Sequence, residues 1–320
     1  MRVLVTGGAG IIGSLTGRLL AERGHSVRLF DARPEPSAAA GAGPAVEVVQ
    51  GDVLSTSQLA VAVCDVDAVV HLAYSLGADT SARPFPATIL NVQGTANVLE
   101  AARIAEVPRA VLASSVAIYG SDGRYPADAL PLDEGAATHL SPGMALYGAG
   151  KLYLEQLAEA YRSAYGLLSV GIRPSPVYGP GGVRGVSGWL AELVEGPMRG
   201  EAVTLDRGDA RISLVYVADV AEQLVRLVEL PAERLPEPGV GGRRFFNTGG
   251  DATTVRELAD LVRELVPGAQ IEVTSAGEPD VAGLPTQVSG RALADLLGYE
   301  RQYDLRAGLQ AHVDAVRARG

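Results

Sequence analysis

The chain contains one lysine, and this lysine follows a tyrosine by one helical turn. Of its 320 residues 27 are basic, and all of these except Lys151 are arginine. Tyr147 lies four residues earlier, and side chains at i and i+4 of a helix share one face. A cation beside a phenol stabilises the phenolate and lowers the pKa of the tyrosine from its ordinary value of about 10. The pair is therefore a candidate general acid and base for an alcohol substrate.

A glycine-rich turn near the start of the chain lies between a predicted strand and a predicted helix. The strand is Arg2–Thr6, rich in β-branched residues, and the amphipathic stretch Ile12–Arg23 predicts the helix. Gly7, Gly10 and Gly13 recur at every third position of the turn. Without Cβ atoms, the backbone N–H groups there can approach a pyrophosphate at the positive end of the helix. This arrangement predicts a dinucleotide site.

An acidic residue follows at the end of the second predicted strand and bears on the choice of cofactor. Asp31 lies 18 residues after Gly13. A carboxylate there accepts hydrogen bonds from the adenosine ribose hydroxyls and repels a 2′-phosphate. We therefore expect NAD rather than NADP. Arg33 is either a solvated loop residue or a cation that softens this preference.

Alternation of short strands and longer helices predicts the fold that holds these residues. Strands are predicted over Arg2–Thr6, Ser26–Asp31, Val46–Gly51, Ala68–Leu72, Ala110–Ser114 and Leu168–Arg173, and helices over Ile12–Arg23, Ser57–Val63, Ala87–Glu106 and Tyr147–Tyr165. Later in the chain, helices are predicted over Val186–Glu195, Ala218–Leu230, Thr254–Leu265 and Arg291–Leu297, and strands over Val203–Leu205, Ser213–Tyr216, Arg244–Asn247 and Gln270–Val273. The pattern is typical of an α/β protein with a Rossmann-type, doubly wound parallel sheet and a smaller C-terminal α/β substrate lobe.

The change in texture after the sixth strand predicts two domains. We expect an NAD-binding Rossmann domain over residues 1–178, to which residues 213–249 return. The substrate-binding lobe would consist of residues 179–212 and 250–320.

Composition excludes several classes of function. The net charge is −10 and no basic run occurs, which argues against nucleic-acid partners. No apolar run reaches membrane-spanning length and no leader peptide is recognisable, so we expect no membrane partner and a cytoplasmic location. Cys64 is the single cysteine, and the four histidines have no ligand spacing, so we expect no metal site.

Further motifs occur in a fixed order along the chain. They are Gly51-Asp52-Val53, His71-Leu72-Ala73, Asn91-Val92-Gln93-Gly94-Thr95, Ser114 to Gly120, Tyr147 with Lys151, and Arg173 to Pro180. Together with the glycine turn and Asp31, they resemble the motifs of the extended short-chain dehydrogenase/reductases in the NAD-dependent epimerase/dehydratase family. The resemblance covers nearly the whole chain and implies an enzyme that often forms homodimers.

The resemblance also implies roles for individual residues. Ser115 matches the catalytic hydroxyl that bonds the substrate oxygen, while Tyr147 moves the proton, Lys151 also bonds the nicotinamide ribose, and the nicotinamide carries the hydride. Contacts to NAD are expected for Gly7, Gly10, Ile11, Ile12, Gly13, Asp31, Arg33, Asp52, Val53, Leu72, Ala73, Asn91, Ser114, Tyr147, Lys151, Pro174 and Val177. Contacts to the substrate are expected for Tyr74, Ser75, Ser115, Tyr147, Pro176, Tyr178, Arg184 and Arg211.

Two branches of the family do not fit this chain. Dehydratases carry an Asp-Glu pair directly after the catalytic hydroxyl residue, where Val116 and Ala117 stand here and cannot move a proton. The 3,5-epimerases need a cysteine in the site, but Cys64 lies early in the chain. The reaction that remains for this chain is the reversible oxidation of a secondary alcohol.

Three departures from the family pattern concern a diphosphate in the substrate. Pro176 replaces a hydrogen-bonding asparagine, and Arg211 lies five residues rather than four before Tyr216. The segment Ser275 to Asp280 contains no arginine.

A sugar-type substrate is expected, with a nucleotide-sugar 4-epimerase or 4-ketoreductase and a sugar or sugar-acid dehydrogenase both open. Further alternatives are a dehydrogenase or ketoreductase for a non-sugar alcohol and a non-catalytic NAD(H)-sensing protein.

Overall fold

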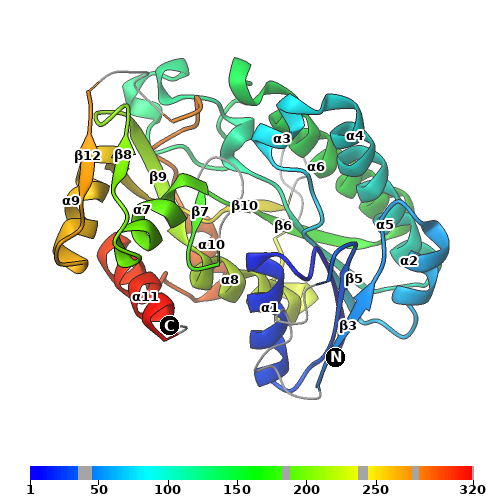
Figure 1. Cartoon of the computed structure of the whole chain (residues 1–320). Coiled ribbons are helices and arrows are strands. Elements are labelled where there is room, and N and C mark those ends of the chain that lie inside the picture. Colours follow the sequence, from blue (N-terminus) through cyan, green and yellow to red (C-terminus); the bar gives the residue numbers. More distant parts are fainter. Residues whose placement is uncertain (35–44, 182–187, 237–243, 276–280, 319–320) are drawn as a thin grey trace.

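The computed structural model describes residues 1–34, 45–181, 188–236, 244–275 and 281–318. Its main feature is a seven-stranded sheet in the order β10-β6-β5-β4-β1-β2-β3, with every pair parallel (Figure 1). The strands are β1 (Arg2–Thr6), β2 (Ser26–Asp31), β3 (Val46–Gln50), β4 (Ala68–His71), β5 (Arg109–Ala113), β6 (Leu168–Arg173) and β10 (Phe245–Asn247). The strand order reverses between β1 and β4, which opens a crevice at the carboxyl edge. The predicted doubly wound sheet is confirmed.

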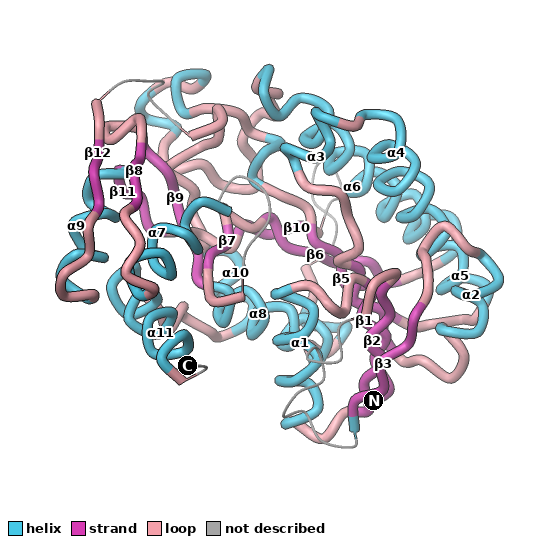
Figure 2. The backbone as a smooth tube through the Cα atoms, in the orientation of Figure 1, coloured by secondary structure: helices cyan, strands magenta, loops and turns pink. Residues whose placement is uncertain are grey.

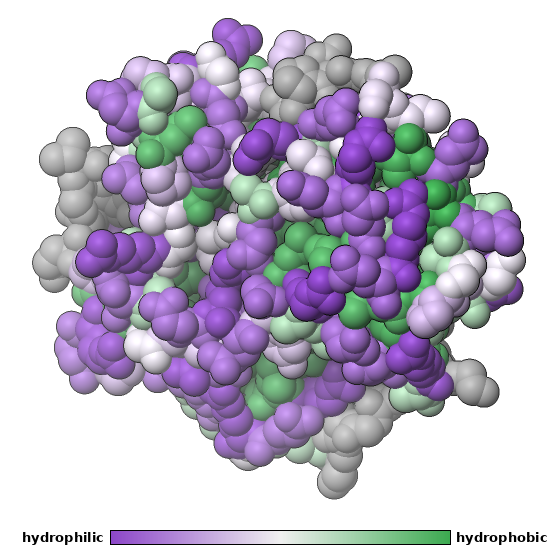
Figure 3. Space-filling view, turned by 90° about the vertical axis from the view of Figure 1, so that its left-hand side faces the viewer, coloured by the Kyte–Doolittle hydropathy of each residue, from purple (hydrophilic) through white to green (hydrophobic). Residues whose placement is uncertain are grey.

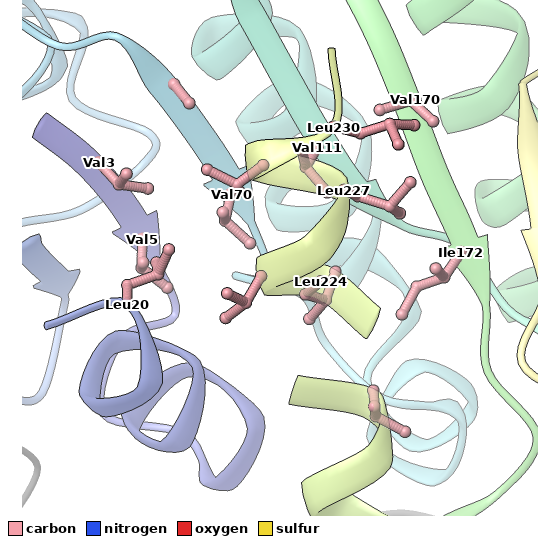
Figure 4. Close-up of a cluster of buried hydrophobic side chains, with 14 of the residues drawn as sticks. Val3, Val5, Leu20, Val70, Val111, Val170, Ile172, Leu224, Leu227 and Leu230 are labelled. Carbon is pink, nitrogen blue, oxygen red and sulfur yellow. The ribbon is translucent and has the colours of Figure 1, made fainter. Parts of the chain in front are cut away.

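Helices cover both faces of this sheet because its strands alternate apolar side chains between the faces. Val3 and Val5 of β1 pack with Leu20 of α1 (Ile11–Glu22) and Leu224 of α8 (Val217–Glu229), as Figure 4 shows. On the other face, Leu4 belongs to a cluster with residues of three more helices. These are α2 (Thr56–Ala62), α5 (Gly94–Ile104) and α6 (Ala145–Tyr165). The sheet is thereby buried on both faces, as a parallel sheet requires.

A smaller lobe lies beside the carboxyl edge of the sheet (Figure 2). It contains the sheet β11-β9-β7 and the pair β12-β8. The strands are β7 (Val177–Tyr178), β8 (Val203–Leu205), β9 (Arg211–Tyr216), β11 (Asp251–Thr254) and β12 (Ile271–Val273), and the helices packed with them are α7 (Gly188–Met198), α9 (Val255–Leu265) and α11 (Leu305–Arg317). Figure 3 views the molecule from this side, where hydrophilic side chains cover most of the surface and apolar ones show in patches.

The segment 213–249 is shared between the two parts. Helix α8 and strand β10 return to the large sheet, and α10 (Arg291–Leu297) packs beside them. Strand β9, in contrast, pairs with β11 and β7 in the lobe. The residue boundaries given above for the two domains stay a prediction. None of the described helices is both long and apolar enough to cross a membrane.

Several elements differ from their predicted form. The helix predicted over Ala87–Glu106 is divided into α4 (Pro84–Thr88), a π-helical turn (Ile89–Gln93) and α5. Helices α3 (Gly77–Ala82) and α11 were not predicted, nor were β7 and β11. Short 3₁₀ turns cover Val116–Ile118, Asp122–Arg124, Ala127–Ala129, Pro142–Met144 and Ala232–Arg234. The predicted start of α7 at Val186 lies outside the described residues.

Candidate active site

A cleft of about 690 Å³ lies where the strands of the large sheet end. Most residues predicted for the site line it, although the loops that carry them are far apart in the chain. They are Gly7, Gly10, Ile11, Ile12, Gly13, Asp31, Arg33, Asp52, Val53, Leu72, Ala73, Tyr74, Ser114, Ser115, Tyr147, Lys151, Pro174, Pro176 and Val177. The parallel sheet brings them together because the carboxyl ends of its strands share one edge.

The glycine turn is packed so tightly that side chains would not fit. Gly7 has a φ of 70°, and a Cβ there would lie 2.7 Å from the backbone nitrogen of Ala73. A Cβ on Gly13 would lie 2.3 Å from the carbonyl oxygen of Gly7. Helix α1 starts directly after Gly10, which supplies no side-chain cap. The first N–H groups of α1 thus remain available to an anion at the positive end of the helix.

The carboxylate at the end of β2 is held in a fixed orientation. The N–H of Ala9 donates to Asp31 Oδ2 at 3.1 Å, and the N–H of Arg33 donates to Oδ1 at 3.0 Å. Each oxygen keeps a second lone pair for a hydroxyl ligand. The turn and the carboxylate are therefore one rigid unit, with an anion site and a hydroxyl acceptor side by side.

Tyr147 and Ser115 come together from two different elements. Tyr147 lies in the first turns of α6 and is buried, and Ser115 caps the 3₁₀ turn after β5, its Oγ accepting from the N–H of Ala117 at 3.1 Å. Burial raises the pKa of Tyr147 to about 12, while a hydrogen bond with Ser115 acts in the opposite direction. The expectation that the pKa of Tyr147 lies below its ordinary value was wrong, because desolvation of the phenolate is the largest effect and raises the pKa.

Lys151 is 3% exposed and lines the cleft. Its Nζ donates to the carbonyl of Ala113 at 2.7 Å. It lies 5.6 Å from the ring centroid of Tyr147 and 3.4 Å from that of Tyr74. Burial lowers the pKa of Lys151 to about 7, and the carboxylate of Glu155 acts against this shift. The predicted proximity of the tyrosine and the lysine is confirmed in the described geometry.

A buried ion pair fastens the end of β6 to α6. Arg173 of β6 donates through Nε and Nη2 to the two carboxylate oxygens of Glu155, both at 2.8 Å. The hydroxyl of Ser114 donates to Glu155 Oε1 at 2.6 Å, and Arg173 Nη1 donates to the Tyr119 hydroxyl at 2.6 Å. Both charged side chains are almost fully buried. Sequence reasoning missed Glu155, although its place four residues after Lys151 was a usable signal.

Some predicted contacts lie elsewhere. The amide of Asn91 pairs with the backbone N–H and carbonyl of Ser75 at 2.6 and 3.1 Å, and neither residue is among those lining the cleft. Tyr178 is 1% exposed and donates to the carbonyl of Leu305, because β7 turns it into the core of the lobe. Arg211 is exposed at the start of β9, away from the cleft. Arg184 lies outside the described residues.

Other residues of the cleft were not predicted. They are Ala9, Phe30, Ala32, Gly51, Leu76, Gly77, Leu90, Ala113, Met144, Ser175, Gly181 and Leu284. Met144 and Leu284 cluster with Tyr147, and Leu76 packs against them. No local motif marks these apolar residues, and Leu284 comes from a distant segment. In the described ranges no group of three or more histidine, cysteine or acidic side chains could hold a metal ion.

The sheet, the glycine turn and the buried tyrosine and lysine define a Rossmann-type enzyme with a dinucleotide cofactor. The chain belongs to the NAD dependent epimerase/dehydratase family, whose model matches residues 3–239. It is thus an NAD-dependent enzyme of the extended short-chain dehydrogenase/reductase type, as the motifs predicted.

Individual relatives extend over most of the chain. It is 32% identical to a UDP-glucose 4-epimerase of Mycolicibacterium smegmatis, covering 99% of both proteins. It is 30% identical to a 3 beta-hydroxysteroid dehydrogenase/Delta 5-->4-isomerase of Mycobacterium tuberculosis over 82% of this chain and 69% of that protein. A solved UDP-glucose 4-epimerase of Thermus thermophilus in complex with NAD superposes with a TM-score of 0.83 and 28% identity, covering 99% of each chain.

Proposed function

We propose that the enzyme transfers a hydride reversibly between NAD and the carbinol carbon of a secondary alcohol, with Tyr147 as the general acid and base. The observation that carries this proposal is the convergence of Tyr147, Lys151 and Ser115 in the cleft that also holds the glycine turn. A proton-transfer group and a dinucleotide site in one cleft are what such a reaction requires.

The residues present fit NAD. The glycine turn leaves backbone N–H groups and no side chain where a pyrophosphate would approach. Asp31 would accept from the ribose hydroxyls, and its negative charge disfavours a 2′-phosphate. Val53 and Leu72 would flank the rings of the cofactor, since both line the cleft. NAD supplies the hydride acceptor, and the protein moves the proton.

The protein's part in the reaction follows from the burial of its groups. Ser115 would donate to the substrate oxygen and so hold it beside the Tyr147 hydroxyl. Because burial raises the pKa of Tyr147 to about 12, the tyrosine is protonated at neutral pH and is ready to donate to a carbonyl oxygen. In the oxidative direction it must accept a proton as phenolate, and the Lys151 ammonium stabilises that form.

A sugar-type substrate is supported by the relatives, which include UDP-glucose 4-epimerases. An epimerase would oxidise and re-reduce the same carbon, whereas a dehydrogenase would release NADH. A second candidate is a dehydrogenase for an apolar alcohol. It is supported by the apolar lining near Tyr147, where Leu76, Met144 and Leu284 lie, and by the similarity to the hydroxysteroid dehydrogenase.

One paired assay separates these readings. In the first assay, the purified enzyme is given NAD with sugars, sugar acids and 3β-hydroxysteroids, and NADH formation is followed by absorbance. In the second, UDP- and dTDP-hexoses are analysed for conversion to the C4 epimer. Epimer formed without net NADH supports the epimerase, and NADH formed with one alcohol class supports the corresponding dehydrogenase. If no member of either set is converted and no NAD binds, the proposed hydride transfer is wrong.

We also propose a homodimer built on α6 and a cytoplasmic location. Leu146 and Tyr153, seven residues apart on α6, are 43% and 44% exposed, and Phe85 of α4 is 78% exposed. Apolar side chains that share a helix face and meet solvent favour association with a second copy. The dependence on NAD and the single cysteine are in keeping with a reducing compartment.

A further inference from the structure

The ring of Tyr74 covers the catalytic lysine. Nζ of Lys151 lies 3.4 Å from the Tyr74 ring centroid, and both residues line the cleft. The same ring meets that of Tyr147 edge to face, with centroids 5.8 Å apart and planes at 83°. An ammonium over an aromatic face is attracted by the ring quadrupole, and more strongly when both are desolvated. Tyr74 therefore contacts both members of the acid/base pair.

Packing, and not a hydrogen bond, sets the position of this ring. The Tyr74 hydroxyl is buried and has no hydrogen-bond partner. Burial raises its pKa above the ordinary value. On the other side of the hydroxyl lies Gly150 of α6, where an added Cβ would come within 2.5 Å of the Tyr74 oxygen. Burying a hydroxyl without a hydrogen-bond partner costs stability. The hydroxyl therefore does not hold Tyr74 in this position, and the contacts of its ring do.

Lys151 has few other groups to balance its charge. From its own helix it faces Tyr147 and Glu155, and that carboxylate already binds Arg173 in a bidentate pair. From β4 it faces His71, whose pKa is lowered to about 3 by burial and by Lys151, so that the imidazole is neutral. The Ala113 carbonyl of β5 accepts one N–H. Two described aromatic rings also favour the ammonium, and the face of Tyr74, at 3.4 Å from Nζ, is much nearer than that of Tyr147, at 5.6 Å.

We propose that Tyr74 is a positioning residue, whose ring holds the Lys151 ammonium beside Tyr147 and favours its charged form, and that Gly150 is required to admit this ring. The proposal rests on the proposed function, since that function gives the charge of Lys151 a purpose. Loss of the ring should therefore let Lys151 lose its proton at lower pH, and the alkaline limb of the activity profile should move with it.

The single lysine makes a direct test possible. Protein labelled with ¹³C at the lysine Cε gives one side-chain signal, and its chemical shift against pH reports the titration of Lys151 without assignment. Tyr74→Leu removes the aromatic face and keeps apolar bulk, Tyr74→Phe keeps the face and removes the hydroxyl, and Gly150→Ala displaces the ring from the other side. We expect Tyr74→Leu and Gly150→Ala to lower the titration midpoint by about 0.5–1 pH unit, and Tyr74→Phe to leave it unchanged.

The outcomes separate this proposal from the proposed function. It is overturned if Tyr74→Leu titrates as the wild type does, or if Tyr74→Phe shifts the midpoint as far as Tyr74→Leu. Because Gly150→Ala tests the ring without altering it, the same conclusion can be reached should Tyr74→Leu fold poorly. A shifted lysine midpoint with an unmoved activity profile would support the contact and contradict the role assigned to Lys151 in catalysis.

Discussion

Burial has opposite effects on the two members of the acid/base pair. It raises the pKa of Tyr147 to about 12 and lowers that of Lys151 to about 7, so each shift favours the neutral form. Catalysis in the oxidative direction needs both groups charged. Each then lies in a site that disfavours its charge. The shift brings the pKa of Lys151 into the neutral range, whereas it moves the pKa of Tyr147 further from that range.

The cost of burying Lys151 predicts a variant that is more stable but inactive. Between pH 7 and 10.5 the unfolded chain holds the lysine proton while the folded chain releases it, so folding stability contributed by this residue rises with pH. Lys151→Met removes the buried charge at similar length. At pH 7 its melting temperature should exceed that of the wild type by about 2–4 °C, and its stability should rise less steeply up to pH 10.5. Thermal unfolding between pH 7 and 10.5 measures the melting temperature and its dependence on pH. If stability rises with pH as steeply in Lys151→Met as in the wild type, the buried lysine is not the cause.

Local spacing predicts some residues of the site but not others. Tyr147 with Lys151, and the glycines with Asp31, lie within one helical turn or one βαβ unit, so their relation is visible in the sequence. Met144 and Leu284 reach the cleft through a packing contact between segments far apart in the chain. Tyr178 was misplaced for the same reason, because the pairing of β7 with β9 decides which way it points.

At the scale of elements, the pair of Glu155 and Arg173 fixes α6 to the edge of the sheet. Both side chains are buried, so removing one partner leaves a charge with no compensation. Glu155→Gln should reduce the free energy of unfolding by about 3 kcal/mol or more in chemical denaturation. The matched control is Glu159→Gln on the same helix, where the partly exposed pair with Arg162 should contribute less than about 1 kcal/mol. If Glu155→Gln and Glu159→Gln lower the free energy of unfolding equally, burial of the Glu155–Arg173 pair does not determine its contribution to stability.

Element prediction succeeds where the sequence repeats a strong pattern. All six strands predicted for the first 173 residues are present. Helix α6 is also present as predicted, although it begins at Ala145, two residues before Tyr147. The two-residue strand β7 and the short strand β11 carry too little pattern, since each exists only through pairing with β9. The π-helical turn at Ile89–Gln93 likewise contains a contact that local spacing does not predict, the pairing of Asn91 with the backbone of Ser75.

At the scale of the whole molecule, the exposed face of α6 predicts the oligomeric state. Sedimentation of the wild type should give twice the chain mass of 33.1 kDa. Tyr153→Glu, in the middle of the proposed interface, should give the monomer because a carboxylate is costly to bury there. Val61→Glu is the matched control, since Val61 is 71% exposed on α2 and lies outside α6. A wild type that sediments as a monomer would contradict the proposed dimer.

The most direct test of the proposed chemistry is the pair of measurements on Tyr147→Phe, made with the substrate that the paired assay identifies. Phenylalanine keeps the ring and its packing with Met144 but cannot exchange a proton. Turnover by Tyr147→Phe should be lower by about 10²-fold or more, and its dissociation constant for NAD, measured by titration calorimetry, should stay within a few-fold of the wild type. Full turnover by Tyr147→Phe would contradict the assignment of Tyr147 as the general acid and base.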